Sequence, residues 1–527
     1  MIRNRLFKIV GAAGLFSLLF APYALTSCSE DEGNYDYHEI PEVTISGIED
    51  SYTVLDGVGY VLEIDPQVTT TGNPADLEYQ WKIQLASSPD INRQYIVGTE
   101  RKLSWSVDET PISSNLVLVF RVTDKTSGVT NAKFINCTKT TRLGSGIMLL
   151  AENENGDAQV QFISMATDTM VVYNALGTES GFEQPLGKPR AILKVGRGTL
   201  IPGPYFWLST EKNAWRFNAS FVKTAKSELS ENIFMTDESY ELGDNILVDA
   251  FPKSRKSGEP MMEMNSSRNA YVLSNGIILL GSTSFVDPCN IVPGENEISL
   301  ARPYIFFNSA NAFQYFLFYD YVHERFLAVN CGGMMGNPSI SKLSDAEGDL
   351  FPWNNQSVNR TLQFGQTTRN TDGDSRYGNS YALMRDKSTN DYFIYKFYKY
   401  TSRNTKMDFY SVGKVATDLT QAKFHAFSSK RTALYYTVGS KLYGLDFNKG
   451  NEKCYLIRDF GEEITYMRSD DQIAPTDDYI YLATYSPGKG GTFMKLEQGM
   501  DPDKLELKEV PGSKWTGFGK IVSWAWK

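Results

Sequence analysis

One repeated unit constrains the fold of this 527-residue chain more than any other feature: an apolar run, a tight turn and a second apolar run. Between residue 141 and the C-terminus, turns such as Asn275-Gly276 and Gly439-Ser440 separate short apolar segments. Asn-Gly and Gly-Ser tolerate the positive φ that tight hairpins require. No long segment combines a helical apolar stripe with helix caps. The sequence therefore predicts an all-β protein in which helices are minor.

Hairpins repeated in this way are typical of the blades of a β-propeller. At roughly 40 to 55 residues per blade, residues 141–527 hold seven or eight blades. Residues 518–526 alternate like a closing strand and would pair with the first strand of the ring. The alternative is a double sandwich or jelly roll, because the repeats are degenerate. We predict a seven-bladed propeller, with strand clusters near residues 150–180, 190–222, 232–285, 300–345, 380–412, 422–460 and 476–527.

Residues 43–140 show a separate, smaller pattern of strands. Apolar and polar positions alternate in residues 79–83 and 116–122, and the turn signal Ser88-Pro89-Asp90 lies between these runs, with Gly72-Asn73-Pro74 before them. About 100 residues of short strands with regular breaks fit an immunoglobulin-like sandwich. Trp81 would be its buried core tryptophan.

The N-terminal residues 1–27 have the features of a lipoprotein signal peptide. Three basic residues precede an apolar run from residue 9 to residue 25, which Pro22 interrupts. A spanning helix needs roughly 20 apolar residues, so a membrane anchor helix is the less favoured alternative. Leu25-Thr26-Ser27-Cys28 resembles the bacterial lipobox, in which the cysteine is acylated, for example with palmitate. We therefore predict that Cys28 is lipidated and becomes the first residue of the mature protein.

Residues 28–42 follow as an acidic tether, with six Asp or Glu residues and no Lys or Arg. Repulsion between like charges, together with Gly33, favours an extended and solvated chain. The tract resembles the acidic export signal that follows the lipidated cysteine of Bacteroidetes surface lipoproteins. A plain spacer is the alternative.

The tether and two motifs of the smaller domain together resemble one family. The motifs are Gly33-Asn34-Tyr35-Asp36-Tyr37, Tyr79-Gln80-Trp81 and Phe120-Arg121-Val122-Thr123-Asp124 with its Ser-Gly turn. With the lipobox, they are similar to the PKD-like family of Bacteroidetes lipoproteins over residues 28–140, and more loosely beyond. The resemblance implies a PKD-type sandwich. By analogy with lipoproteins that sit beside nutrient importers, it also implies a role in nutrient capture, and it implies no catalytic residue.

Composition excludes several classes of partner and site. A formal net charge of −10 and a pI of about 5.1 argue against a nucleic-acid partner. Three His and five Cys make a zinc scaffold or a three-histidine site unexpected, and we predict no metal and no cofactor. Asp372-Gly373-Asp374 has the oxygen ligands for Ca²⁺, but a solvated loop is favoured. Buried thiols are expected instead of disulfides at Cys137, Cys289, Cys331 and Cys454.

A search for catalytic motifs finds none. The sequence lacks a G-x-S-x-G elbow and an H-E-x-x-H motif, and the glycine-rich residues 486–492 fit a hairpin tip better than a phosphate loop. Paired carboxylates on a propeller would suit glycoside hydrolysis, but no pair stands out among 62 acidic residues. We predict no enzymatic activity, with a glycoside hydrolase or other hydrolase as the alternative.

Aromatic residues near loops are the candidate ligand contacts. Trp353, Asn354 and Asn355 lie within the longest polar stretch, residues 344–380, and Trp207 flanks a turn. An indole stacked on a sugar ring or another flat ligand, with amides beside it, would form a binding site. The alternatives are that Trp353 packs beneath its own loop and that Trp207 belongs to the core of a blade.

These features together predict a non-enzymatic lipoprotein of the outer membrane of a Gram-negative bacterium, facing the cell exterior. Its partners would be the membrane, through the lipid anchor, and a TonB-dependent importer with its companion lipoproteins. The propeller would bind a glycan, a peptide or a small nutrient. A structural or adhesive surface protein is a further alternative, which would present an apolar patch to a partner.

Overall fold

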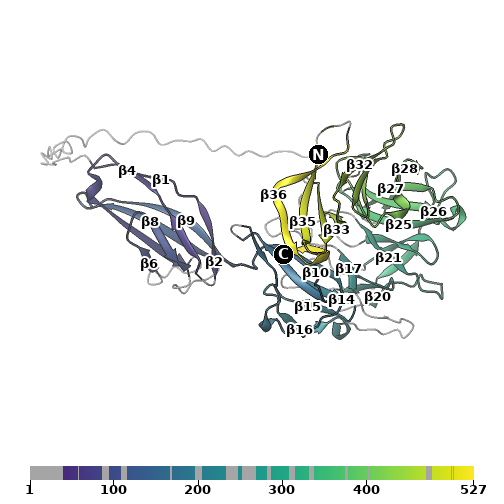
Figure 1. The fold of residues 1–527 in the computed structure, drawn as a ribbon, viewed down its shortest axis with the longest axis horizontal. Helices are drawn as coiled ribbons and strands as arrows, with labels where there is room; N and C mark the ends of the chain where they lie inside the picture. The colour runs from purple at the N-terminus through teal and green to yellow at the C-terminus, as the bar shows by residue number, and fades with distance from the viewer. Residues whose placement is uncertain are drawn as a thin grey trace, which may run out of the picture.

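Strands dominate the part of the chain that the computed structural model describes (Figure 1). Helical turns there are 3-10 segments of three residues each. The signal peptide, Cys28 and most of the acidic tether lie outside the described residues. Those residues are 40–56, 59–85, 94–107, 115–166, 169–195, 205–232, 247–251, 269–281, 287–307, 315–331, 338–373, 375, 378–400, 403–470, 478–499, 501 and 504–527.

The first nine strands form the sandwich. A five-stranded sheet has the order β2-β9-β8-β5-β6, and two strand pairs, β1-β4 and β3-β7, accompany it. All of these pairs are antiparallel except β2 with β9. The strands are β1 (Val43–Ser46), β2 (Ser51–Asp56), β3 (Val61–Ile64), β4 (Gln67–Thr70), β5 (Leu77–Leu85), β6 (Gln94–Gly98), β7 (Leu103–Ser106), β8 (Asn115–Asp124) and β9 (Thr130–Thr141).

Trp81 lies at the centre of the sandwich core. Its ring is fully buried and stacks on Phe120 of β8, with the ring centroids 4.2 Å apart. The indole Nε1 donates a hydrogen bond to the Glu100 carbonyl oxygen at 3.0 Å, which satisfies its one polar group. The prediction that Trp81 is a core residue is confirmed.

The remaining strands form seven four-stranded antiparallel sheets, which we number as blades 1 to 7. Blade 1 contains β10 (Gly146–Glu152), β11 (Ala158–Ser164), β12 (Met170–Val172) and the last strand, β37 (Lys520–Trp526). Blade 2 contains β13 (Pro189–Val195), β14 (Tyr205–Thr210), β15 (Ala214–Phe217) and β16 (Lys223–Glu228). Blade 3 contains β17 (Leu247–Phe251), β18 (Asn269–Leu273), β19 (Ile278–Gly281) and β20 (Asp287–Pro288).

The other four blades follow in chain order. Blade 4 contains β21 (Ala301–Phe307), β22 (Tyr315–Asp320), β23 (Arg325–Asn330) and β24 (Ser339–Lys342). Blade 5 contains β25 (Arg360–Thr367), β26 (Ser380–Asp386), β27 (Tyr392–Tyr400) and β28 (Arg403–Gly413). Blade 6 contains β29 (Phe424–Phe427), β30 (Ala433–Val438), β31 (Lys441–Asp446) and β32 (Lys453–Asp459). Blade 7 contains β33 (Glu463–Ser469), β34 (Tyr479–Ser486), β35 (Gly490–Gln498) and β36 (Leu507–Phe518).

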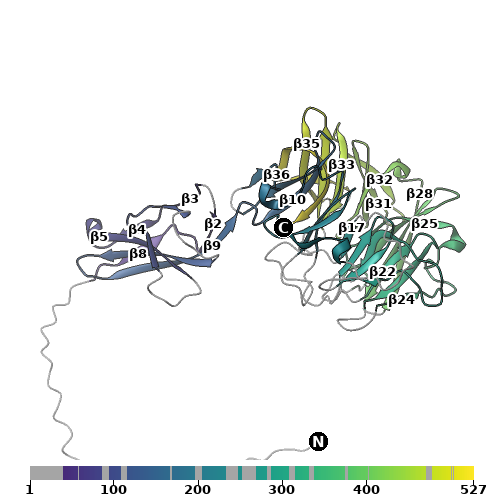
Figure 2. The ribbon, with the colours of Figure 1, turned by 90° about the horizontal axis from the view of Figure 1, so that it is seen from below.

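The last strand closes the ring. β37 pairs antiparallel with β10, so that Leu149 lies opposite Trp524 and Ile147 opposite Trp526. Figures 1 and 2 show β10 beside the C-terminal strands of blade 7. The predicted closing strand is therefore confirmed, and it completes the blade that the first propeller strands begin.

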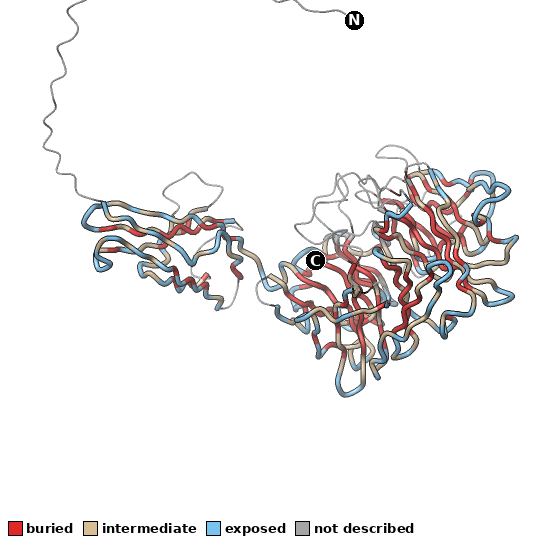
Figure 3. Tube along the Cα trace, turned by 90° about the horizontal axis from the view of Figure 1, so that it is seen from above, coloured by how far each residue is buried: buried red, intermediate tan, exposed pale blue. Residues whose placement is uncertain are grey.

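Apolar contacts between blades hold the ring together. Each of seven buried clusters joins residues of two neighbouring blades, including blades 7 and 1. Successive strand residues point to opposite faces, so Ile147 and Leu149 pack towards blade 7 while Met148 and Leu150 pack towards blade 2. Figure 3 shows the buried positions along the strands and the exposed ones mainly at the turns. This arrangement is an all-β fold in which an immunoglobulin-like, PKD-like sandwich precedes a seven-bladed propeller.

The tight turns follow the glycines of the sequence. Gly156 and Gly276 have φ of +78° and +90°, in the left-handed region that glycine tolerates. A Cβ on Gly276 would also lie 2.9 Å from the Ala301 carbonyl oxygen, which is too close for any side chain. The predicted hairpins at Asn275-Gly276 and Gly439-Ser440 are confirmed by the pairing of β18 with β19 and of β30 with β31.

The four cysteines outside the signal region behave as packing residues. Cys137, Cys289 and Cys331 are buried, and Cys454 is half-buried. Desolvation raises the pKa of Cys137 to about 11, so this thiol stays protonated at neutral pH. The Cys454 sulfur lies 3.1 Å from the Tyr436 hydroxyl, which occupies it in a local hydrogen bond.

Candidate functional site

The loop that carries Trp353 is packed against blades 4 and 5. The indole is 4 % exposed, and its ring centroid lies 5.6 Å from that of Phe326 and 5.4 Å from that of Phe397. The Asp345 carboxylate accepts hydrogen bonds from the backbone N–H groups of Trp353 and Asn354, at 2.7 and 3.0 Å. The ring therefore presents no open face on which a ligand can stack.

The two predicted amides differ in their environments. Asn355 is fully buried: its Oδ1 accepts a hydrogen bond from the Tyr395 hydroxyl at 2.8 Å, and its Nδ2 donates to the Trp353 carbonyl oxygen at 3.2 Å. Asn354 is exposed, and its Oδ1 accepts a hydrogen bond from the backbone N–H of Gln356 at 3.2 Å. Asn355 is thus used to shape the loop, and Asn354 is alone in reaching solvent among these three residues.

Trp207 lies in the core between blades 2 and 3. It is 2 % exposed and meets Tyr271 edge to face at a centroid distance of 6.2 Å. The prediction that Trp207, Trp353 and Asn355 contact a ligand is therefore corrected to a packing role. The physical reason is that burying the Trp207 and Trp353 rings between blades removes a large apolar surface from water. The Asn355 amide is occupied by hydrogen bonds that shape its loop.

A different site lies where the innermost strands of the blades converge. This central pocket has a volume of about 310 Å³ and is lined from β13, β17, β21, β25, β29, β33 and β37, one strand from each blade. Small-molecule sites commonly fall in this size range and combine apolar walls with a few polar groups. The lining of this central pocket includes Asp249, Tyr304, Phe364, His425, Tyr466 and Arg468.

Aromatic rings form much of the wall of the central pocket. Phe364 stacks on the His425 imidazole at 5.3 Å and meets Tyr304 edge to face at 5.3 Å. Tyr466 packs against Phe424 at 5.7 Å. Burial lowers the pKa of His425 to about 4, so its ring is neutral at pH 7 and acts as a further flat, uncharged surface.

The polar lining of the central pocket is fixed by contacts between blades. The Gln366 amide nitrogen donates to the Ser469 hydroxyl at 2.8 Å and to the Phe427 carbonyl oxygen at 3.2 Å. Its amide oxygen accepts from the Phe427 backbone N–H at 2.8 Å. One side chain of blade 5 thus ties together the inner strands of blades 6 and 7, which holds the pocket wall rigid.

Basic groups outnumber acidic groups in the lining of the central pocket. Arg190, Lys423 and Arg468 contribute positive charge, and Asp249 contributes negative charge. Lys423 is offset by an ion pair with Glu463 at 3.4 Å. The Arg468 guanidinium lies 4.5 Å from the Trp524 ring centroid and donates to the Trp524 carbonyl oxygen at 3.3 Å. This geometry suits a flat ligand that carries an acidic or strongly polar group.

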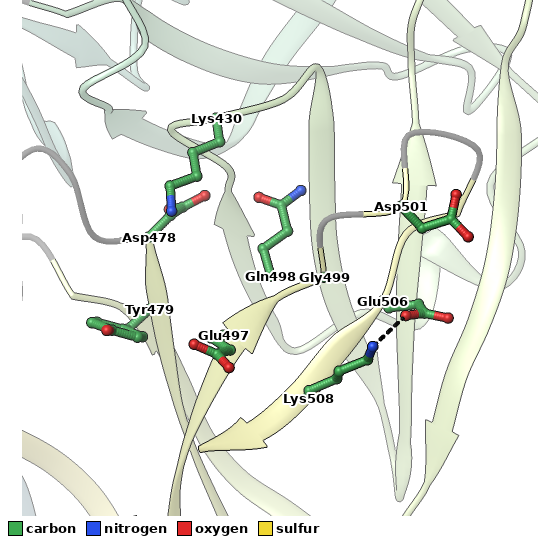
Figure 4. Close-up of a pocket in the computed structure, with 9 residues that line it drawn as sticks. All are labelled: Lys430, Asp478, Tyr479, Glu497, Gln498, Gly499, Asp501, Glu506 and Lys508. Carbon is green, nitrogen blue, oxygen red and sulfur yellow. Dashed lines mark ion pairs between the residues drawn. The ribbon is translucent and has the colours of Figure 1, made fainter. Parts of the chain in front are cut away.

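A second, wider pocket lies at the edge of blade 7 (Figure 4). Its volume is about 540 Å³, and it contains four carboxylates, those of Asp478, Glu497, Asp501 and Glu506. Figure 4 shows Asp478 beside Lys430 on one side and the Glu506–Lys508 ion pair, at 3.2 Å, on the other. We call this the blade 7 pocket.

Asp478 is the buried carboxylate of the blade 7 pocket. It is 8 % exposed, and desolvation raises its pKa against the opposing effects of hydrogen bonds from Ser428 and Ser429 and of Lys430. Its Oδ2 accepts from the Ser428 hydroxyl at 2.7 Å and from the Ser429 backbone N–H at 3.1 Å. Because both donors belong to the turn after β29, the carboxylate connects blade 7 to blade 6.

Within the described residues, no group of three or more His, Cys, Asp or Glu side chains is arranged to hold a metal ion. In the segment Asp372-Gly373-Asp374, which was considered as a Ca²⁺ site, Asp372 accepts a hydrogen bond from the Asn370 amide nitrogen at 2.8 Å. Asp374 lies outside the described residues. A search of the same described residues for a helix of membrane-spanning length and hydropathy returns none.

The sequence analysis missed the central pocket because its lining residues are spread along the chain from residue 190 to residue 523. Each inner strand contributes a few residues, and those residues are separated by whole blades in the sequence. A signal is nevertheless present: Phe424-His425 and Tyr466 stand at the starts of apolar runs, where inner strands would be expected. Finding them requires the blade register, which a single strand does not reveal.

The comparison with protein families gives one match. Residues 28–189 match the PKD-like family. The match covers the sandwich and extends through β10, β11 and β12 to the start of β13. The resemblance drawn from the tether and sandwich motifs therefore holds for that part of the chain. No curated protein matches the sequence.

Two of the similar solved structures are distant in sequence. A quinoprotein alcohol dehydrogenase-like protein from Bacteroides thetaiotaomicron is 14 % identical, with 91 % of this chain and 99 % of that chain covered and a TM-score of 0.36. An ancestral GH74 enzyme is 10 % identical, with 77 % of this chain and 56 % of that chain covered and a TM-score of 0.36. At these TM-scores the similarities carry no inference about function.

Proposed function

We propose that this protein is a non-enzymatic binding lipoprotein that captures a small nutrient in the central pocket of its propeller. The observation that carries the proposal is the pocket itself, which one strand of each blade lines and whose lining includes aromatic and basic side chains. A rigid wall that is already formed lowers the entropic cost of ordering a site around a ligand. The preferred ligand is a small molecule with a flat group and an acidic or strongly polar group.

The sequence supports the proposed location. The lipobox-like residues 25–28 and the acidic tether suit a protein that is anchored by Cys28 in the outer membrane and displayed outside the cell. In this arrangement the sandwich is a spacer, and the propeller delivers its ligand to a TonB-dependent importer with companion lipoproteins. Proteolysis of intact cells should then cleave the protein, and Cys28→Ala should abolish incorporation of labelled palmitate. Complete protection of the wild-type protein would refute surface display.

Binding in the central pocket is tested with the purified mature protein. Calorimetric titrations with free amino acids, tripeptides and aromatic carboxylates should find a ligand that is retained unchanged. Phe364→Ala and Tyr466→Ala should each weaken that ligand about tenfold, because each removes one aromatic wall. Tyr455→Ala, on the outer strand β32, is the matched control and should bind normally. Turnover of a compound without its retention would overturn the binding proposal.

A second candidate function is hydrolysis in the blade 7 pocket, which one observation favours. Asp478 is a buried carboxyl with a raised pKa, as a general acid requires, and it shares a pocket with Glu497 and Glu506. Its hydrogen bonds to Ser428 and Ser429 instead give it a structural use. Assays of glycan breakdown decide the matter: activity that Asp478→Asn abolishes would establish the hydrolase.

A further inference from the structure

A third pocket lies at the junction where the ring closes. It is formed between the β10–β11 turn of blade 1 and the β34–β35 turn of blade 7, and its volume is about 570 Å³. We call it the seam pocket, and its lining includes Glu152, Gln159, Gln161, Tyr173, Tyr485 and Gly519. We propose that the seam pocket binds a neutral carbohydrate, at a site separate from the central pocket.

Tyrosine rings give the seam pocket its apolar surface. Tyr173 is 50 % exposed, yet its hydroxyl donates to the Thr516 carbonyl oxygen at 3.3 Å and its ring lies 6.0 Å from that of Phe518. Gly517 makes this close approach possible, because a Cβ there would lie 3.1 Å from the Tyr173 hydroxyl oxygen. Tyr485 is half-buried on the other blade. A held ring with an exposed face is what the C–H face of a sugar stacks on.

A relay of amides fixes which polar groups the seam pocket presents. The Gly519 backbone N–H, which can only donate, gives a hydrogen bond to the Gln161 Oε1 at 3.1 Å. Gln161 is 3 % exposed, and its Nε2 donates in turn to the Gln159 Oε1 at 3.3 Å. Because the first donor sets both orientations, the Gln159 Nε2 is left as the donor at the end of the relay.

Carboxylate acceptors complement that amide donor. Glu152 and Glu154 line the same pocket. The lysine in the lining, Lys489, is neutralised by an ion pair with Glu462 at 3.1 Å. A hydroxyl group both donates and accepts, so amide N–H groups and carboxylates in one pocket match it. The excess of carboxylates disfavours an anionic ligand, and the amide donor gives the hydroxyl groups of a neutral sugar a partner that a cation cannot use.

The experiment titrates the mature protein with cellotetraose, xylotetraose, mannotetraose and maltotetraose, and with choline as a cationic probe. At least one oligosaccharide should bind, and Tyr173→Ala and Tyr485→Ala should each weaken it about tenfold. Gln159→Ala should weaken it about threefold. Tyr455→Ala, a tyrosine of the outer strand β32, serves as the matched control. Melting temperatures would verify that each variant folds.

Three results would overturn the proposal: none of the oligosaccharides binds, binding survives both tyrosine variants, or choline binds in their place. A sugar that is lost only with Phe364→Ala would belong to the central pocket. That outcome would refute the seam site and leave the proposed function intact. Conversely, a seam pocket that binds sugar in a protein whose central pocket takes no ligand would separate the two proposals.

Discussion

The Asp345 carboxylate accepts a hydrogen bond from the backbone N–H of Trp353 at 2.7 Å. The same carboxylate forms an ion pair with Lys406 at 2.7 Å, and the Lys406 ammonium lies 5.2 Å from the Trp353 ring centroid. Lys406 comes from β28, the last strand of blade 5. These contacts turn a polar stretch that resembles a binding loop into a packed cover over blades 4 and 5.

Removing that carboxylate should loosen the cover. Asp345→Ala leaves the backbone N–H groups of Trp353 and Asn354 without their acceptor, and hydrogen bonds to charged groups contribute about 1.5–3 kcal/mol each. We expect the free energy of unfolding of the propeller to fall by about 2–3 kcal/mol in urea titrations. Asp349→Ala is the control, because Asp349 also pairs with Lys406 but accepts one backbone hydrogen bond, from the Ala346 N–H, where Asp345 accepts two. Equal effects of the two variants would contradict this account.

The closing strand should be essential to the ring. Trp524 of β37 is fully buried between blades 7 and 1, where it lies 4.5 Å from the Tyr481 ring. Truncating a buried tryptophan to alanine costs about 3–5 kcal/mol, and we expect that loss for Trp524→Ala. Deleting residues 520–527 should be more severe, because it exposes the edge of β10. Trp215→Ala, at a half-buried tryptophan of β15, should cost less, and an unaltered melting temperature in Trp524→Ala would disprove the closure argument.

Much of the fold could be predicted because its determinants are local. Period-two alternation and Asn-Gly turns mark each hairpin within about ten residues, and the alternation of residues 518–526 marks the closing strand. The runs that are apolar at every position, such as residues 147–151, also have a plain cause. Their strand is buried on both faces, between two blades.

The candidate sites depended on contacts that are distant in sequence. From the sequence alone, Trp353 resembles a binding residue, because the two residues that pack against it, Lys406 and Phe397, are distant from it in the chain. The central pocket collects a few residues from each of seven strands, so no local sequence motif predicts it. The seam pocket brings Tyr173 of blade 1 close to Tyr485 of blade 7, and these residues meet only when the ring of blades is closed.

His323 should make the stability of blade 4 depend on pH. Its Nδ1 lies 2.7 Å from Asp320 and its Nε2 lies 2.7 Å from Glu297. Burial acts to lower the pKa of His323, but the hydrogen bonds to Glu297 and Asp320 together outweigh it and the pKa is raised. A raised folded-state pKa adds stability below the unfolded value of about 6.5, and that stability is lost as pH rises through the folded value. The melting temperature of wild type should therefore exceed that of His323→Gln most at pH 5.5.

The comparison across pH is the control for His323. The gap in melting temperature between wild type and His323→Gln should narrow steadily from pH 5.5 to pH 8.5. His425→Gln provides the contrast, because burial lowers the pKa of His425 to about 4 and its ring is neutral over that whole range. A His323 gap that stays constant or widens towards pH 8.5 would show that the imidazolium is not the stabilising form.

Asp478 should behave in the opposite sense from an ion-paired carboxylate. Desolvation raises its pKa, so the folded protein holds this proton more tightly than the unfolded chain does. Stability is then lost as pH rises from the unfolded value near 3.9 through the raised folded value. Asp478→Asn keeps an acceptor for Ser428 and Ser429 without the buried charge, so at pH 7 it should melt at or above the wild-type temperature, and the difference should shrink towards pH 4. An Asn variant that melts well below wild type at pH 7 would mean that the charge itself holds blades 6 and 7 together.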